Sequence, residues 1–195
     1  MRLTRRQRAL FEEAEAIASM TNFDFHRIEK DKNIDATLSL QIAIHKMVTG
    51  EVVIRYTLLD EILADLIARY FFQRADFPKL WRTKKFSTFV HHVLDEMYLL
   101  KKMDVVHAIK PLPSNVRKAI RKINAVRNAF AHSLFPENRK EHRENKKVLY
   151  GDRDIRTHEG LKNFLVDYHL AFNYLERRFD EQDAGGAKRR PDRPV

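Results

Sequence analysis

The chain has 195 residues, with 37 basic and 27 acidic side chains, a formal net charge of +10 with histidine neutral, and no cysteine. A chain of this length can bury its own core without disulfides, and the lack of cysteine excludes thiolate zinc sites and a cysteine nucleophile. No charged start followed by an apolar run opens the sequence, so we expect no secretory signal and a cytoplasmic protein. The longest apolar stretch, residues 52–72, is excluded as a membrane span because it contains Arg55, Asp60, Glu61, Asp65 and Arg69.

In the first part of the chain, apolar residues recur at three- and four-residue intervals, which predicts helices. A first helix is expected over 10–18, a loop over the charged segment 24–34, and a long central helix over about 35–72, with Gly50 as its break or kink. The broad apolar side of the long helix comprises Ile54, Leu58, Leu59, Ile62, Leu63, Leu66, Ile67 and Tyr70.

The middle of the chain contains the signals of a connection followed by further helices. Phe77-Pro78 and Trp81 mark the connection, after which Ser87 is expected to cap a helix that reaches about Leu100. A short helix is expected around 103–109.

Proline and glycine divide the last third. Pro111-Leu112-Pro113-Ser114 ends one element and caps a helix over about 115–132, which Pro136 prevents from continuing. Gly151-Asp152 between apolar residues predicts a small β-hairpin, and Thr157 begins a final helix.

Together these elements predict an all-α fold, a bundle of roughly four to six helices with a small β-hairpin. We expect the helices around 58–71 and 116–130 to form the core pair, because they carry the widest apolar faces. One domain is expected over 1–183, followed by a disordered basic tail over 184–195.

Much of the positive charge lies near the two ends, but one internal segment, 105–136, contains basic residues and no acid. A local patch of this kind attracts phosphate, although a solvated helix face would have the same composition. The candidate nucleic-acid-binding residues are Lys110, Arg117, Lys118, Arg121 and Lys122.

Arg127 occupies an unusual position on the helix over 115–132. At about 100° per residue it falls inside the apolar stripe formed by Val116, Ile120, Ile123 and Phe130. A buried guanidinium requires compensation, so Arg127 reaches water, pairs with an internal acid such as Asp65, or lines an interface cleft. A polar edge beside the stripe contains Arg117, Arg121, Asn124, Asn128 and His132.

The run Arg127-Asn128-Ala129-Phe130-Ala131-His132 at the end of a helix resembles the signature of HEPN domains (higher eukaryotes and prokaryotes nucleotide-binding). These are all-helical bundles, many of them dimeric, metal-independent ribonucleases. The chain is also similar to helical proteins of the mannitol-operon-regulator type, in which a comparable run occurs without a demonstrated need for catalysis. The likeness is sharp over 115–135, weaker over 35–175, and absent in both tails. Arg153 and His158 repeat the spacing, but they lack the Asn and span a predicted turn.

The resemblance implies an RNA substrate and cleavage by the neighbouring 2′-hydroxyl, which leaves a 2′,3′-cyclic phosphate. His132 would transfer protons, Arg127 would stabilise charge on the phosphoryl oxygens, and Asn128 would orient either of them. One chain supplies a single such histidine, so a two-histidine site requires a homodimer. No cofactor or metal is expected.

Three functions remain open at this point. The first is a candidate HEPN-type endoribonuclease, such as the toxin of a toxin-antitoxin or phage-defence system, with an antitoxin or regulatory protein as partner. The second is a catalytically silent HEPN-like interaction or regulatory protein, in which His132 and Asn128 stabilise a helix end. The third is a DNA-binding regulator, which is disfavoured because its reading helix would bury Val116, Ile120 and Ile123.

Other chemical motifs are weak. His91-His92, Asp60-Glu61 and Asp95-Glu96 are adjacent pairs, whose side chains diverge on a helix. The sequence contains no Gly-rich phosphate loop and no nucleophile elbow.

Overall fold

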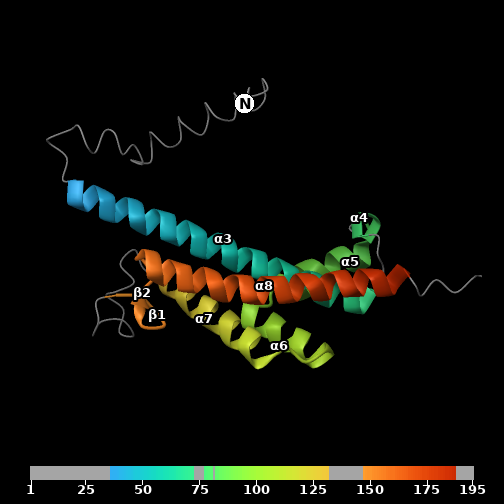
Figure 1. Cartoon of the computed structure of the whole chain (residues 1–195). Helices are drawn as coiled ribbons and strands as arrows, with labels where there is room; N and C mark the ends of the chain where they lie inside the picture. Colours follow the sequence, from blue (N-terminus) through green and yellow to red (C-terminus); the bar gives the residue numbers. More distant parts are fainter. Residues whose placement is uncertain (1–35, 73–76, 81, 132–146, 188–195) are drawn as a thin grey trace, which may run out of the picture. The chain divides into compact units, whose positions relative to one another are not determined.

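The computed structural model describes residues 36–72, 77–80, 82–131 and 147–187 (Figure 1). These residues are mostly helical, with one small two-stranded antiparallel sheet, which confirms the predicted all-α class with a hairpin. The chain divides into two compact units, 1–50 and 51–195. The expected helix over 10–18, the loop over 24–34, Trp81 and His132 lie outside the described residues.

Helix α3, Ala36–Phe72, corresponds to the predicted long helix and continues through Gly50, where a break or kink was expected, without a break. In the second unit it buries the stripe Val52, Leu59, Leu63, Leu66 and Ile67. Three residues assigned to its apolar side, Ile54, Leu58 and Tyr70, are exposed. The predicted apolar side was therefore wider than the buried one.

The next elements are the short helices α4, Phe77–Leu80, and α5, Lys84–Phe89, and the π-helix η1, Val90–Leu94. Thr83, not Ser87, is the N-cap of α5, and its side-chain oxygen accepts a hydrogen bond from the Phe86 N–H at 3.4 Å. Ser87 lies within the first turns, where its N–H donates to the Thr83 carbonyl at 3.1 Å. The prediction was wrong because both hydroxyl residues can cap a helix, and the chain enters the helix at the earlier one.

Helix α6, Leu99–Ile109, begins before the predicted start at Met103. After Pro111 and Pro113, α7 spans Ser114–Ala131. Its buried face carries the predicted residues together with further small and branched ones, namely Val116, Ala119, Ile120, Ile123, Val126, Ala129 and Phe130. The predicted stripe of α7 is therefore confirmed.

The predicted hairpin consists of β1, Leu149–Tyr150, and β2, Arg153–Asp154, joined through Gly151 at φ 68°. Such a φ favours glycine. Helix α8, His158–Ala187, follows at once, and the Thr157 hydroxyl oxygen accepts from the Gly160 N–H at 3.2 Å. Here α8 passes so close to the hairpin that a Cβ at position 160 would overlap the Asp154 carbonyl. Its last residues enter the segment expected as a tail, and 188–195 lie outside the described residues.

Within the second unit, α8 packs along α7 and beside α3. The Arg55 guanidinium lies 5.0 Å from the Tyr168 ring centroid, and the Arg69 guanidinium lies 3.7 Å from that of Phe179. Both pairs join α3 to α8. Leu63 of α3 and Ile123 of α7 are both buried. The predicted core pair is not the main one, because α7 packs chiefly along α8.

Candidate active site and basic surface

Arg127 lies near the C-terminal end of α7 and is half-buried, as expected for a cation in an apolar stripe. Its guanidinium carbon lies 4.7 Å from the centroid of the Tyr56 ring on α3, and its Nη1 donates to Asn128 Oδ1 at 3.3 Å. An aromatic face attracts a guanidinium through the negative potential of its π electrons. The ring and the amide oxygen therefore hold the cation in place.

The carboxylates near this part of α3 interact with other cations. Asp60 accepts a hydrogen bond from Lys102 Nζ at 2.6 Å, and Lys102 is buried. Asp65, the internal acid suggested for Arg127, interacts with Arg69 one turn later on the same helix. In the part of the chain that the structure describes, Arg127 forms no ion pair with a carboxylate.

Tyr56 is a site residue that the sequence did not reveal. Burial raises the pKa of its phenol, the neighbouring Arg127 opposes this shift, and Asp60 reinforces it. The phenol is therefore neutral near pH 7, and the positive charge of Arg127 faces a ring rather than an anion. A tyrosine beside the apolar stripe of α3 was the available signal, but nothing local in the sequence indicated its partner.

Asn128 is half-buried and accepts the hydrogen bond from Arg127. Helix α7 ends at Ala131, so His132 follows the last described residue of this helix. The structure thus brings Arg127 and Asn128 into contact, and the position of the His132 side chain lies outside the described residues.

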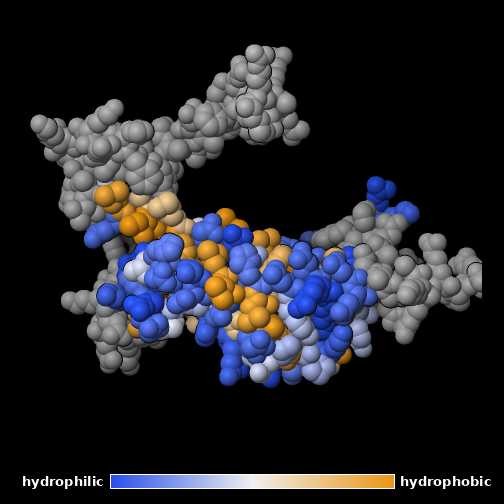
Figure 2. Space-filling view, viewed as in Figure 1, coloured by the Kyte–Doolittle hydropathy of each residue, from blue (hydrophilic) through white to orange (hydrophobic). Residues whose placement is uncertain are grey.

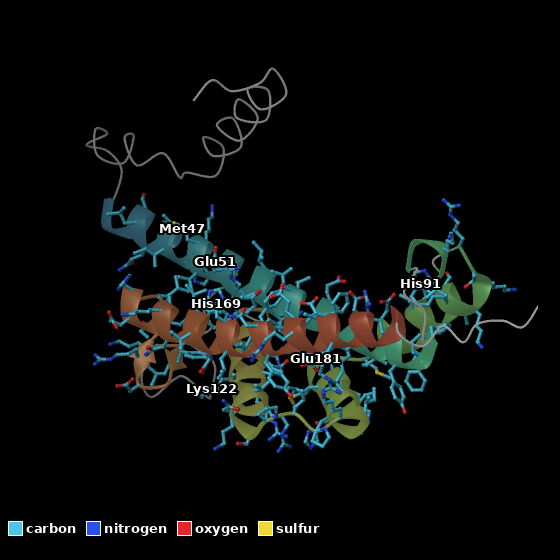
Figure 3. The ribbon with its side chains drawn as sticks, turned by 45° about the vertical axis from the view of Figure 1, so that its right-hand side comes forward. Met47, Glu51, His91, Lys122, His169 and Glu181 are labelled. Atoms are coloured by element: carbon cyan, nitrogen blue, oxygen red, sulfur yellow. The ribbon has the colours of Figure 1, made fainter. Side chains whose placement is uncertain are left out.

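Two of the five predicted nucleic-acid-binding residues form ion pairs with carboxylates of α8. Lys110 Nζ lies 3.2 Å from Glu181 Oε2, and Lys122 Nζ lies 3.0 Å from Asp167 Oδ2. Figure 3 shows Lys122 on α7 and Glu181 on α8. Both lysines are exposed, so solvent screens these pairs strongly.

The other three residues, Arg117, Lys118 and Arg121, all lie on α7. Lys118 and Arg121 are exposed, and no ion pair involves them among the described residues. Arg117 is half-buried, and its Nε has no hydrogen-bond partner in the described structure. Lys118 and Arg121 are one turn apart and share one side of the helix with Lys122. We call this side of α7, with Lys118, Arg121 and Lys122, the basic surface.

A separate acidic cleft of about 210 Å³ lies between α3, η1 and α6. Its ionisable residues are Asp60, Glu61, Asp65, His91, Asp95 and Lys102. Burial raises the pKa of Asp65, with Arg69 opposing and Glu61 reinforcing the shift. The cleft thus brings together residues of the adjacent pairs Asp60-Glu61, His91-His92 and Asp95-Glu96. Among the described residues, however, no three His, Asp or Glu side chains form a metal-binding group.

Comparison of the chain with protein-family models, curated proteins and solved structures gave no match. None of the described helices is long and apolar enough to cross a membrane. The fold and site therefore define a helical protein with a half-buried arginine held at the end of one helix and a basic surface on that same helix.

Proposed function

We propose that the protein is a HEPN-type, metal-independent endoribonuclease. The observation that carries this proposal is the state of Arg127, a half-buried guanidinium held by a neutral ring and an amide, with no carboxylate partner in the described structure. Desolvation of a cation is unfavourable unless an anion compensates for it. A phosphodiester of bound RNA is an anion of suitable geometry, because its oxygens match the planar N–H groups of arginine.

The proposed reaction needs no external nucleophile. A base removes the proton of the RNA 2′-hydroxyl, the 2′-oxygen bonds to the adjacent phosphorus, and the bond from phosphorus to the 5′-oxygen breaks. The 5′-oxygen takes up a proton, and a 2′,3′-cyclic phosphate remains on the other fragment. His132 transfers protons near neutral pH, Arg127 stabilises the negative charge on the phosphoryl oxygens, and Asn128 orients Arg127.

The proposal includes a homodimer with the end of α7 at or near the seam, because each chain supplies one histidine of this motif. Exposed apolar side chains of the second unit, among them Ile54, Leu58, Val166 and Leu170, are available to a partner, and Figure 2 shows apolar surface over α8. Sedimentation should give about twice the chain mass of 23.2 kDa at micromolar concentration. A monomer under these conditions would contradict the dimer.

The proposed biological setting is that of a cytoplasmic toxin in a toxin-antitoxin or phage-defence pair, with an antitoxin or regulatory protein as its partner. RNA would lie on Lys118 and Arg121, with Lys110 and Lys122 exchanging their carboxylates for phosphates. Exposed pairs contribute little stability, so this exchange requires little free energy.

A second candidate is a catalytically silent HEPN-like interaction or regulatory protein. It is favoured by the pairing of Lys110 and Lys122 with acids of α8, which reduces the positive field available to nucleic acid. The two candidates differ in their chemistry, since a silent protein can bind RNA but leaves it intact.

The deciding experiment is an RNA cleavage assay with purified protein and excess EDTA. Wild type should cut single-stranded RNA and leave 2′,3′-cyclic phosphate ends. Folded His132→Ala should be slower by about 10²- to 10⁴-fold, and Arg127→Lys should also be severely impaired because a point charge does not replace a bidentate fork. Cutting at the wild-type rate by His132→Ala would exclude the proposed site.

A further inference from the structure

The ring of Tyr56 provides a platform for the Arg127 side chain. Arg127 lies over this ring with its guanidinium carbon 4.7 Å from the centroid, and one of its N–H groups is directed to Asn128. A ring contacts the face of a guanidinium and leaves the N–H edges free for hydrogen bonds. This arrangement restricts the orientation of Arg127 and leaves donors for a ligand.

The polar end of Tyr56 lies near the start of α6. The Leu99 backbone lies close enough to the phenol of Tyr56 to oppose the rise in its pKa, and Leu99 is the first residue of α6. The first N–H groups of a helix have no partner within the helix, and the N-cap residue of α6, Tyr98, makes no side-chain capping bond. The Tyr56 phenol therefore lies beside the start of α6, and its ring contacts Arg127 of α7.

The described groups around Tyr56 do not neutralise the charge of Arg127 through an ion pair. Asp60, one turn after Tyr56, is bound by the buried Lys102 at 2.6 Å. The phenol is neutral because burial and Asp60 raise its pKa against the effect of Arg127. Arg127 is thus supported by a neutral group and can direct its charge toward an incoming anion.

We propose that Tyr56 is a positioning residue, which holds the Arg127 guanidinium at the orientation needed to bind a phosphodiester group. The inference rests on the proposed function for its substrate class, RNA. It predicts that the aromatic ring of Tyr56 matters more for this role than its hydroxyl.

The test compares Tyr56→Leu with Tyr56→Phe, and uses Tyr98→Leu, at an exposed tyrosine, as the matched control. We expect Tyr56→Leu to lower kcat/KM for cleavage about 10-fold, the effect of losing one cation–π contact, with part of the loss appearing as a higher KM because Arg127 binds the phosphodiester group less well. Tyr56→Phe should stay within about threefold of wild type, since it keeps the ring. In an Arg127→Ala background, Tyr56→Leu should have no further effect.

A second readout does not depend on catalysis. In wild type, proton resonances of the Arg127 side chain should show a ring-current shift that persists in Tyr56→Phe and Tyr98→Leu and disappears in folded Tyr56→Leu. Titration with a 2′-O-methyl RNA, which cannot be cut by this chemistry, should move the same resonances. Tyr56→Leu should weaken that response about 10-fold.

The outcomes separate this inference from the proposed function. If wild type cuts no RNA but binds the methylated RNA through Arg127 in a manner that depends on Tyr56, the positioning role stands and the nuclease proposal falls. If wild type cuts RNA and Tyr56→Leu cuts and binds like wild type, or if no ring-current shift exists, the positioning role is overturned and the nuclease proposal stands. If wild type neither cuts nor binds RNA, both are overturned.

Discussion

Arg178 of α8 donates from Nη1 to the backbone carbonyl oxygen of Lys110, at 2.8 Å. Its Nη2 donates to the carbonyl of Val106 at 3.2 Å, and the residue is 4% exposed. Both carbonyls lie at the C-terminal end of α6. The Val106 carbonyl also accepts from the Lys110 N–H at 3.1 Å, whereas the Lys110 carbonyl lies beyond the last helical bond. A side chain from another helix thus caps α6 and fixes α8 to it.

Replacing Arg178 with Met should lower the free energy of unfolding by about 2–3 kcal/mol, because the buried Val106 carbonyl and the partly buried Lys110 carbonyl lose charge-assisted hydrogen bonds. The matched control is Arg177→Met at the exposed neighbouring position, expected within about 0.5 kcal/mol of wild type. Urea denaturation followed by circular dichroism measures both variants. Equal stabilities of the two variants would show that the cap contributes nothing.

The pair between the buried Lys102 and the partly exposed Asp60 should also be needed for stability. Lys102→Met leaves the Asp60 carboxylate without its partner, and Asp60 Oδ1 already has no hydrogen-bond partner in the described structure. We expect a loss of about 3 kcal/mol in the free energy of unfolding, and recovery of most of it when Asp60→Leu is added, because an apolar pair can replace a buried ion pair. A double variant less stable than Lys102→Met alone would contradict this account.

Removing one carboxylate should strengthen RNA binding. Glu181→Gln frees the exposed Lys110 from its 3.2 Å contact, and we expect a higher affinity together with a steeper dependence on salt, since one more lysine can contact phosphate. Arg121→Ala should weaken binding and reduce the salt slope by about 1. Lys84→Ala, at an exposed position on α5, is the control. Fluorescence anisotropy at several salt concentrations would measure the slopes, and an unchanged slope in Arg121→Ala would remove this residue from the proposed RNA surface.

Stability should fall at alkaline pH through Tyr150. Burial, followed by its 2.8 Å hydrogen bond to Asp167 and the charge of that carboxylate, raises the pKa of the Tyr150 phenol well above its usual range. The folded state therefore favours the neutral phenol, and this contribution is complete below about pH 10 and declines as the pH rises above that value. Tyr150→Phe should be less stable by about 1 kcal/mol at pH 7 and should lose stability less steeply above pH 10. Parallel stability curves for the two proteins would exclude Tyr150 as the cause.

The helices could be predicted because their causes are local. The spacing of Val116, Ile120 and Ile123 predicts the buried face of α7, and Gly151 predicts the hairpin turn. Two errors came from competition between similar signals. Thr83 and Ser87 are both capping residues, and Ile54 is as apolar as the buried Leu63 but lies on the outer side of α3.

The site was predictable only in part, since its partners come from distant segments. The apolar stripe placed Arg127 at the border of the core, and the structure agrees. Its contact with Tyr56 depends on how α3 crosses α7, which no local pattern contains. The ion pair between Lys110 and Glu181 could not be predicted either. Lys110 lies in a segment without acidic residues, and its partner comes from a different helix.

The close passage of α8 over the hairpin has a consequence for tracing this chain through evolution. At Gly160 the neighbour is the Asp154 carbonyl, which belongs to the main chain, so no exchange of a partner side chain could make room for a larger residue. An arginine and a histidine at a fixed spacing arise readily by chance. The Tyr150-Gly151 turn followed by Thr157-x-x-Gly160 is instead required by the path of the backbone. Related proteins that keep this hairpin should therefore keep Gly160, even where Arg127, Asn128 and His132 have been replaced.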